Sequence, residues 1–550
     1  MYNIKSSTSS EMASVSGSAR KLRKKPLVLK LTNASQLPQN TNCLACSDDG
    51  RYLCLGHAGG LSVWCATTLN HEAQWLQERL EITCLHMTTT GETFYLLASI
   101  DDMGVARVFM FNLECIYPFS VINSLEDINK RNVCFNFEIS EGGDYGAASM
   151  RCNTDIWLDI YYFPVEDWMR ELKDPKLSAN MKWSPAPRVN KIMPSAATMT
   201  DFSNMLTHCL VLDDTNEPPR HCTYHFLLKC GHSHGQNKPK SGCPITVCFW
   251  WNGSYNLLYH MLSKTTKFKQ EPQPSVLWPN AAEIVCSAVS RCTRFIALGL
   301  SNTLVCVWDR LAGAPLSVCT LSTDSAFLRL QFADYCLACT DITQTLTTGE
   351  IRLVVVCKSG AVYIMNTRRG KATRSVQLSQ RSKDSGDMLT VTASVAFLRG
   401  LVGKQLTTSL LVHRNGKMFM QDVVNGATVC ALIPPTNHLL ATHCTPVYAL
   451  NVKQHILYMQ GVQESTLCSS SIGDERPSQL LVLRFDEHDV TKPYVVSQPQ
   501  SPRLQAISVT GEEACNDYLH ERALSMEERH KSITQTWKRL QETGAYVKNC

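Results

Sequence analysis

Two stretches that lie far apart in the chain share nearly the same residue pattern. Residues 47–56 read SDDGRYLCLG, and residues 290–299 read SRCTRFIALG. Each begins with a serine-led turn, continues with arginine and an aromatic residue, and ends at Leu-Gly. A second strand pattern follows shortly after each stretch and ends in tryptophan, as LSVW at 61–64 and LVCVWD at 304–309. A turn, a strand, a tight turn and a strand with a Trp-Asp-type ending are typical of one blade of a β-propeller.

Looser copies of this pattern occur along most of the chain. Two of them contain the dipeptides Ser359-Gly360 and Asn415-Gly416, which supply the positive φ that two-residue hairpin turns require. The looser copies lie at 88–112, 140–163, 352–371, 408–427, 447–461 and 479–485.

The repeats predict an all-β fold. We expect a WD40-like β-propeller, one ring of seven or eight degenerate blades between residues 26 and 487, followed by a C-terminal α-helix. The ring must close, because an open sheet edge invites aggregation. The strand 26–31, PLVLKL, could complete the last blade from the other end of the chain.

The repeats also single out residues with structural roles. Gly56 and Gly299 end the first of the two matched strands, and Trp64 and Trp308 lie at the end of the second. Asp309 completes the one true Trp-Asp pair among the repeats. Because alternating apolar positions place one strand face in the packing between blades, we expect Trp308 to pack there.

Three segments outside the repeats differ in composition. Residues 1–25 are serine-rich with a late basic cluster, and we expect them to be disordered. Residues 164–219 are rich in proline, which predicts an insertion over the propeller face with a short helix near 165–173. Residues 488–512 are rich in Pro, Gln and Ser and are expected to form a linker.

Residues 513–550 are predicted to form a helical tail. The sequence SMEE at 525–528 is a capping box, and Ile533, Trp537 and Leu540 follow at helical spacing. A lone helix of this length is marginal in water, so this stripe must be buried on the propeller or in a partner's groove. The linker has little apolar content to hold the helix close, which favours partner binding by these three residues.

Charge and composition exclude several classes of protein. The net charge of +5 is small for 550 residues and argues against nucleic-acid binding, which needs a dense basic face. No run of 18 apolar residues occurs, so no membrane span is predicted. The N-terminus lacks the apolar region of a secretory signal, although its Ser- and Arg-rich composition leaves a mitochondrial transit peptide as the alternative. The 25 cysteines are then expected to be reduced, largely buried thiols of a cytoplasmic protein.

The sequence contains no established catalytic motif. It has no phosphate-binding loop, no dinucleotide-binding glycine motif, no HExxH and no GxSxG. The Cys-x-x-Cys pairs at 43–46 and 336–339 are too far apart in sequence to predict one zinc ribbon, and core packing explains them better. We therefore expect a protein that is not an enzyme and that has no cofactor and no small-molecule substrate.

The stretch 221–251 holds four cysteines and four histidines. Alternating apolar residues at both ends predict two strands joined by a long hairpin loop, 231–243. Four residues could furnish the ligands of a structural zinc site, but their spacing is unusual, and the glycines and lysines of the loop favour a polar surface loop. The zinc site remains the alternative, with the ligands Cys230, His232, His234 and Cys243.

The C-terminal part of the chain resembles a known family. The strand pair at 416–440, TPVYAL at 445–450 and TWKRLQ at 536–541 resemble the WD repeat-containing protein 93 family over about 400–545. The resemblance implies a non-enzymatic scaffold in the axoneme of motile cilia and flagella, in the C1 projection of the central-pair apparatus. Its implied partners are other central-apparatus proteins, and its implied location is the cytoplasm and cytoskeleton. Two alternatives remain, a metal-binding or electron-transport accessory protein and a general cytosolic adaptor.

Overall fold

The computed structural model describes most of the chain between residues 26 and 491, together with positions 531, 534, 535, 537, 538 and 541 of a C-terminal helix. The expected disordered segment 1–25 and nearly all of the linker 488–512 therefore lie outside the described residues. Within 26–491, the residues left undescribed are 32–36, 39–40, 78, 124, 154, 174–181, 195–220, 229–242, 263–274, 291–292, 311–312, 322–325, 333–350, 360, 368–372, 380–393, 399–407, 413–417, 423–427, 441–446, 452 and 464–478.

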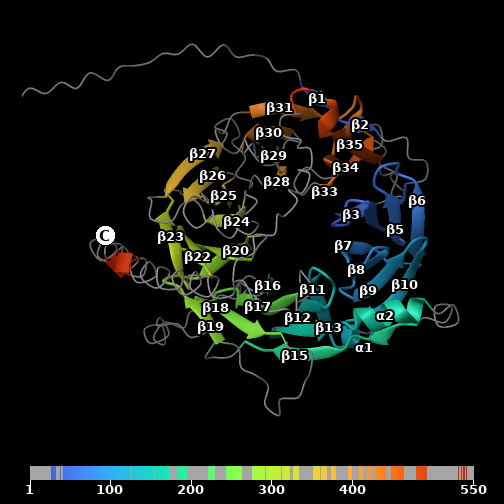
Figure 1. Ribbon diagram of the computed structural model, residues 1–550, viewed down its shortest axis with the longest axis horizontal. Helices are drawn as coiled ribbons and strands as arrows, with labels where there is room; N and C mark the ends of the chain where they lie inside the picture. The colour runs from blue at the N-terminus through green and yellow to red at the C-terminus, as the bar shows by residue number, and fades with distance from the viewer. Residues whose placement is uncertain are drawn as a thin grey trace, which may run out of the picture.

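The strands form eight sheets that follow one another around a ring in chain order (Figure 1). Each blade of the first half has four strands in chain order, and the short strand β14 (Ser184–Pro185), which comes between two strands of blade 3, adds a fifth to blade 2. Blade 1 has β3 (Thr41–Cys46), β4 (Tyr52–His57), β5 (Gly60–Cys65) and β6 (His71–Leu76); blade 2 has β7 (Ile82–Thr89), β8 (Phe94–Asp101), β9 (Ala106–Asn112) and β10 (Cys115–Val121); blade 3 has β11 (Asn132–Ile139), β12 (Tyr145–Cys152), β13 (Asp155–Tyr162) and β15 (Arg188–Ile192); blade 4 has β16 (Cys222–Leu228), β17 (Pro244–Trp251), β18 (Asn256–Met261) and β19 (Ser275–Pro279).

The second half of the ring continues in the same way. Blade 5 has β20 (Ile284–Val289), β21 (Phe295–Leu300), β22 (Leu304–Asp309) and β23 (Ala314–Thr320); blade 6 has β24 (Phe327–Phe332), β25 (Ile351–Cys357), β26 (Val362–Thr367) and β27 (Arg374–Ser379); blade 7 has β28 (Ser394–Leu398), β29 (Thr408–Val412), β30 (Met418–Asp422) and β31 (Thr428–Ile433); blade 8 has β32 (His438–Leu440), β33 (Tyr448–Asn451), β34 (Ile456–Gln463) and β35 (Gln479–Arg484). The predicted propeller is confirmed, and its blades number eight.

The N-terminal strands close the ring. β1 (Leu27–Val28) pairs in parallel with β31 of blade 7, and β2 (Lys30–Leu31) pairs antiparallel with β35 of blade 8. Between them, Leu29 donates its backbone N–H to the carbonyl oxygen of Ile433 at 2.9 Å. The strand 26–31 thus completes the last blade as predicted and, in addition, extends blade 7.

The two faces of the ring are distinguished by the loops that they carry. Neighbouring strands within a blade are antiparallel. The turn between the first and second strands and the turn between the third and fourth strands therefore lie on the same face of the ring, which we call the first face. The turns between second and third strands, and the connections between blades, lie on the opposite face, which we call the second face.

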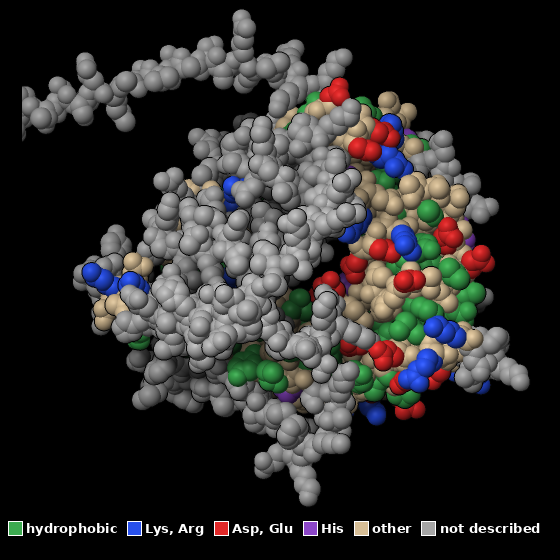
Figure 2. All heavy atoms as spheres, in the orientation of Figure 1, with side chains coloured by type: hydrophobic (Ala, Val, Ile, Leu, Met, Phe, Trp, Pro, Cys, Tyr) green, Lys and Arg blue, Asp and Glu red, His purple; other side chains and the backbone are tan. Residues whose placement is uncertain are grey.

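In the orientation of Figure 1, acidic and basic side chains are interspersed over the described surface beside β6 and β10 (Figure 2).

The described apolar core lies between the blades. Each core cluster combines residues of two consecutive blades, as where Leu27 and Leu29 pack with Leu432 of blade 7 and Leu481 of blade 8. Cysteines contribute to this packing as expected, and burial raises the pKa of the Cys286 thiol to about 12. The buried cysteines among the described residues are Cys54, Cys134, Cys222, Cys248, Cys286, Cys306, Cys357 and Cys430.

The proline-rich composition predicts one insertion over 164–219, and the structure differs. The expected helix is present as α2 (Val165–Leu172), but its Val165, Trp168 and Leu172 are buried in the core between blades 2 and 3. Beyond it, β14 and β15 belong to blades 2 and 3. Proline misleads here because it is tolerated on edge strands, where no ladder hydrogen bond is lost. Residues 195–219 lie outside the described part of the chain.

Two smaller helices complete the described elements. α1 (Leu125–Asn129) connects blades 2 and 3, and the 3₁₀ helix η5 (Phe485–Glu487) follows the last strand. Thr491 is buried beyond η5, so the propeller extends a few residues past the expected boundary at 487. None of the described helices has the length and apolar character that crossing a membrane requires.

We predict that ring closure depends on residues 26–31. Deleting them exposes the apolar surface that Leu27 and Leu29 cover and should lower the free energy of unfolding by about 3–6 kcal/mol. It also leaves the edges of β31 and β35 unpaired, which favours aggregation. Denaturant unfolding and light scattering measure both effects. Deleting 1–25 alone is the control and should change neither; equal stability of the two deletion variants would contradict the closure.

Candidate functional site

The two repeat glycines occupy equivalent positions, in β4 and β21. A Cβ on Gly56 would lie 2.4 Å from Cys43 Sγ and 2.7 Å from Ile82 Cγ2, and one on Gly299 would lie 2.6 Å from Cys286 Sγ. Cys43 and Cys286 belong to the first strand of the same blade, whereas Ile82 begins the first strand of the next. The glycines therefore allow close approach of consecutive blades.

The two repeat tryptophans also occupy equivalent positions and contact the preceding blade. Trp64 is buried with blade 8 residues and donates its indole N–H to Ser62 Oγ at 2.9 Å. Trp308 is half-buried and stacks on Trp278 of blade 4, with ring centroids 4.6 Å apart. Both side chains thus lie between blades, where the alternation of apolar positions predicts them.

Asp309 forms a buried ion pair within blade 5. Its carboxylate accepts hydrogen bonds from Arg294 Nε at 3.0 Å and from Arg294 Nη2 at 2.9 Å. The guanidinium in turn lies over the ring of Phe295, 5.0 Å from the centroid. Two-pronged pairing of this kind fixes geometry, so the role of Asp309 is structural.

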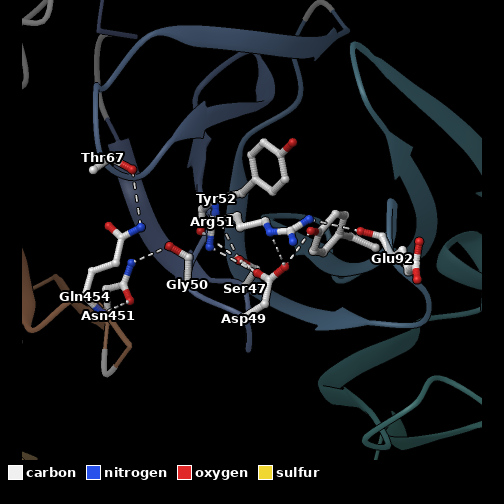
Figure 3. Close-up of polar contacts among 10 residues, drawn as sticks. Ser47, Asp49, Gly50, Arg51, Tyr52, Thr67, Glu92, Asn451 and Gln454 are labelled. Carbon is white, nitrogen blue, oxygen red and sulfur yellow. Dashed lines mark hydrogen bonds and ion pairs between the residues drawn. The ribbon is translucent and has the colours of Figure 1, made fainter. Parts of the chain in front are cut away.

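The turn that opens the first repeat joins blades 8, 1 and 2 on the first face (Figure 3). Ser47 Oγ donates to Asp49 Oδ1 at 2.6 Å, and Tyr95 of blade 2 donates its hydroxyl to Asp49 Oδ2 at 2.6 Å. Burial opposes ionisation of Asp49, but these two hydrogen bonds, with the backbone N–H and the charge of Arg51, outweigh it and hold its pKa below the usual value. Asn451 of blade 8 donates to the carbonyl oxygen of Gly50 at 2.8 Å. The turn therefore fastens the first blade to both of its neighbours.

A second polar contact joins blades 4 and 5. His225 Nε2 lies 2.8 Å from Ser287 Oγ, and Trp250 donates its indole N–H to the same oxygen at 2.8 Å. Burial lowers the pKa of His225 to about 4. The imidazole is therefore neutral at physiological pH.

A pocket of about 300 Å³ lies between blades 2 and 3. It is at the second face, where β10 ends, β11 begins and β12 turns into β13, with α1 beside it. Its lining combines apolar and charged side chains of blade 3 and of the connection that leads to it from blade 2. Those that bear on its chemistry are the apolar Ile122, Met150 and Met193, the acidic Asp127, Asp155 and Asp159, and the basic Arg188 and Lys191.

Asp159 is the most deeply buried charged group of this pocket, with 3% of its side chain exposed. Its Oδ2 accepts hydrogen bonds from Trp157 Nε1 at 2.9 Å and from the Tyr161 hydroxyl at 3.3 Å, and Arg188 Nη1 lies 3.5 Å away. Its Oδ1 is buried without a hydrogen-bond partner. Burial raises the pKa of Asp159, only partly offset by Trp157, Arg188 and Lys191.

The two basic groups of the pocket already have partners. Arg188, which is half exposed, pairs with Asp159. Lys191 Nζ lies over the ring of Trp157, 4.1 Å from its centroid, which is a favourable cation–π geometry. An unsatisfied acceptor in the lining, three carboxylates and apolar walls are features of a binding site.

Sequence patterns alone did not identify this pocket. One signal was available, because Asp159 interrupts the apolar run of β13, DIWLDIYY, at a position that strand periodicity places inside the protein. A lone acid in such a strand indicates a buried carboxylate that requires partners. The partners themselves come from β13 and from β15, the strand that pairs with it.

The candidate zinc ligands are mostly undescribed. Cys230, His232 and His234 lie outside the described residues, and Cys243 is half-buried at the start of β17. β16 and β17 pair antiparallel around the loop, so the predicted two strands with a long connection are confirmed. Among the residues that the structure describes, no group of three or more His, Cys, Asp or Glu side chains could hold a metal ion.

The predicted partner-binding helix is described in part. Trp537 is 63% exposed. The described neighbours Lys531, Lys538 and Gln541 are also exposed. Ile533 and Leu540 lie outside the described residues.

Comparisons with known proteins agree with this fold. The family model described as WD repeat-containing protein 93 matches residues 41–214 and 198–305. This match covers blades 1 to 4 and the first two strands of blade 5, whereas the resemblance seen in the sequence lies at about 400–545.

Several solved structures are similar at low identity. A computationally designed protein, Ika8, matches with a TM-score of 0.42 and 13% identity over 84% of this chain and 100% of that chain. Chaetomium thermophilum Sqt1, bound to the N-terminus of the ribosomal protein L10, matches with a TM-score of 0.47 and 13% identity over 84% and 99%. Chaetomium thermophilum Raptor matches with a TM-score of 0.37 and 10% identity over 82% and 29%. The number of blades, eight, is taken from the sheets of this chain and not from these similar structures.

We predict that Gly56→Ala destabilises the propeller, because the added methyl group would overlap Cys43 and Ile82. Overpacking of this kind should cost about 1–3 kcal/mol in denaturant unfolding. Gly91→Ala is the matched control, since a Cβ there meets its nearest atom at an ordinary 3.6 Å. Equal stability of the two variants would show that β3, β4 and β7 do not pack as described.

The partly buried imidazole of His225 predicts a dependence of stability on pH. Between the ordinary pKa of 6.5 and the folded value of about 4 for His225, the unfolded chain binds a proton that the folded chain does not. This contribution to stability is therefore complete above pH 6.5 and is lost towards pH 4, by up to about 1.4 kcal/mol per pH unit. His225→Gln can keep the hydrogen bond to Ser287 and should flatten the slope in denaturant unfolding at pH 7, 6 and 5. An unchanged slope would count against a buried neutral imidazole.

Proposed function

This chain belongs to the WD repeat-containing protein 93 family, and we propose that it is a structural component of the central-pair apparatus of motile cilia and flagella. A WD-repeat propeller of this kind is generally a non-enzymatic scaffold for protein–protein interaction. The proposed location is the axoneme, within the C1 projection. The proposed partners are other central-apparatus proteins.

The closed ring is the observation that carries the scaffold role. Strand pairing at 26–31 and the polar contacts of the Ser47–Gly50 turn hold the first and last blades together. Loops on both faces are then presented from a rigid base, which keeps the cost of ordering a binding surface low. Such a frame suits a protein that binds several neighbours at fixed positions.

Thiol chemistry is disfavoured at the buried cysteines. Burial raises the pKa of Cys286 and Cys306, each to about 12, so little thiolate is present at neutral pH. These thiols serve as small apolar side chains in the packing between blades.

The tail is the proposed anchor to the axoneme. An exposed tryptophan on a helix that follows a polar linker is suited to a partner's groove, where tryptophan commonly supplies much of the binding energy. Exposure of 63% at Trp537 is consistent with this role.

Recovery of the chain with isolated axonemes tests the proposal as a whole. A tagged copy expressed in ciliated cells should remain with the axoneme after detergent extraction and should cross-link to central-apparatus proteins. Recovery only in the detergent-soluble fraction would overturn the axonemal role and favour a general cytosolic adaptor.

Trp537→Ala should reduce axonemal retention several-fold while leaving thermal unfolding of the propeller unchanged, because the side chain is exposed in the described structure. Retention is measured by quantitative blotting of extracted axonemes. Gln541→Ala changes another exposed position of the same helix and serves as the control. Unchanged retention together with a lower melting temperature would mean that the helix instead stabilises its own propeller.

A further inference from the structure

We propose that the pocket between blades 2 and 3 binds a basic side chain, arginine or lysine, of a protein partner. This inference rests on the proposed scaffold role and specifies one of its contact sites. It assigns Asp159 as the residue that receives the cationic end of that side chain.

The composition of the pocket matches a long basic side chain. Arginine and lysine combine an apolar stem with a charged tip. Ile122, Met150 and Met193 offer apolar wall for the stem, and Asp127, Asp155 and Asp159 offer carboxylates for the tip. A volume of about 300 Å³ is at the lower end of ligand pockets and is sufficient for one such side chain.

The unsatisfied oxygen of Asp159 supplies the second argument. Oδ1 has no hydrogen-bond partner, although only 3% of the Asp159 side chain is exposed. A buried acceptor without a donor costs free energy, more so when it is charged. An incoming guanidinium or ammonium group would supply that donor through a charge-assisted hydrogen bond.

The partners of the resident charges favour a cation over an anion. Arg188 pairs with Asp159 Oδ2, and Lys191 lies over Trp157. The unmet requirement is therefore a donor, and an anion would be placed against three carboxylates. Lys191 occupies the aromatic surface that a second cation would also favour, so it acts as an internal competitor for the ligand.

This arrangement predicts effects of opposite sign for two substitutions. Asp159→Asn removes the acceptor charge but keeps an oxygen for the Trp157 indole N–H, which protects the fold. Lys191→Met removes the competing cation and keeps a side chain of similar length. Weaker binding of a basic side chain is expected for the first variant and tighter binding for the second.

The experiment titrates the purified full-length chain with capped tripeptides by calorimetry or NMR. The probes are acetyl-Gly-Arg-Gly-amide, its lysine version and a neutral citrulline version. We expect the arginine or lysine peptide to bind and the citrulline peptide to bind at least about tenfold more weakly. Asp159→Asn should weaken binding of the basic peptide about tenfold, and Lys191→Met should strengthen it several-fold.

Two further variants make the result decisive. Glu126→Gln on α1 removes an exposed negative charge beside the pocket without changing its lining and should leave binding unchanged. Asp155→Asn removes a rim carboxylate and should weaken binding less than Asp159→Asn. It also tests the pocket if Asp159→Asn fails to fold, which thermal unfolding would report.

Three outcomes would overturn the proposal. They are equal binding of the citrulline peptide, the same loss in Glu126→Gln as in Asp155→Asn, and a reversal of sign in which Lys191→Met weakens binding. Peptide binding is measured without cilia, so its failure is separate from that of the axonemal role. A chain retained in axonemes that binds no basic peptide would reject the pocket and leave the scaffold role standing.

Discussion

Closure of the ring is the constraint on which the rest of the structure depends. The core lies between blades, so a missing neighbour would leave an apolar sheet face in water on each side of the gap. Residues 26–31 prevent this by adding one strand to blade 7 and one to blade 8. The Ser47–Gly50 turn then binds blade 1 to blade 8 through Asn451 and to blade 2 through Tyr95. Through these contacts the first and last blades pack against each other as the other consecutive blades do.

Equivalent positions explain why such a degenerate chain still forms a regular ring. Gly56 and Gly299 recur where the first strands of adjacent blades approach, and Trp64 and Trp308 recur where a blade faces its predecessor. Blades 1 and 5 therefore share the residues at these contact positions, although the rest of their sequences differs. The pocket at Asp159 lies outside this pattern, beside blade 3, whose outer strand β15 follows the helix α2.

Much of the fold could be predicted from local patterns, because strand alternation and turn residues report on neighbours in sequence. The number of blades could not be predicted, because blade 8 is irregular. Two short strands, β32 and β33, pair with the same edge of β34, and the outer strand of this blade comes from residues 30–31. The proline-rich interval also concealed two blade strands. The site was less predictable still. Asp159 is visible as an acid in an apolar strand, but Arg188 reaches it only when β15 pairs with β13, and Ile122 and Asp127 reach it from the connection between blades 2 and 3.

The pairing of residues 27–31 with residues 432–433 and 481–482 has a consequence for synthesis of the chain. The segment that seals the ring leaves the ribosome long before its partners do, and loops of that length close slowly. Until then the apolar edges of the early blades lack their final neighbour, as in other large proteins that fold through exposed intermediates. Nascent chains of this protein are therefore expected to depend on chaperones for most of their translation.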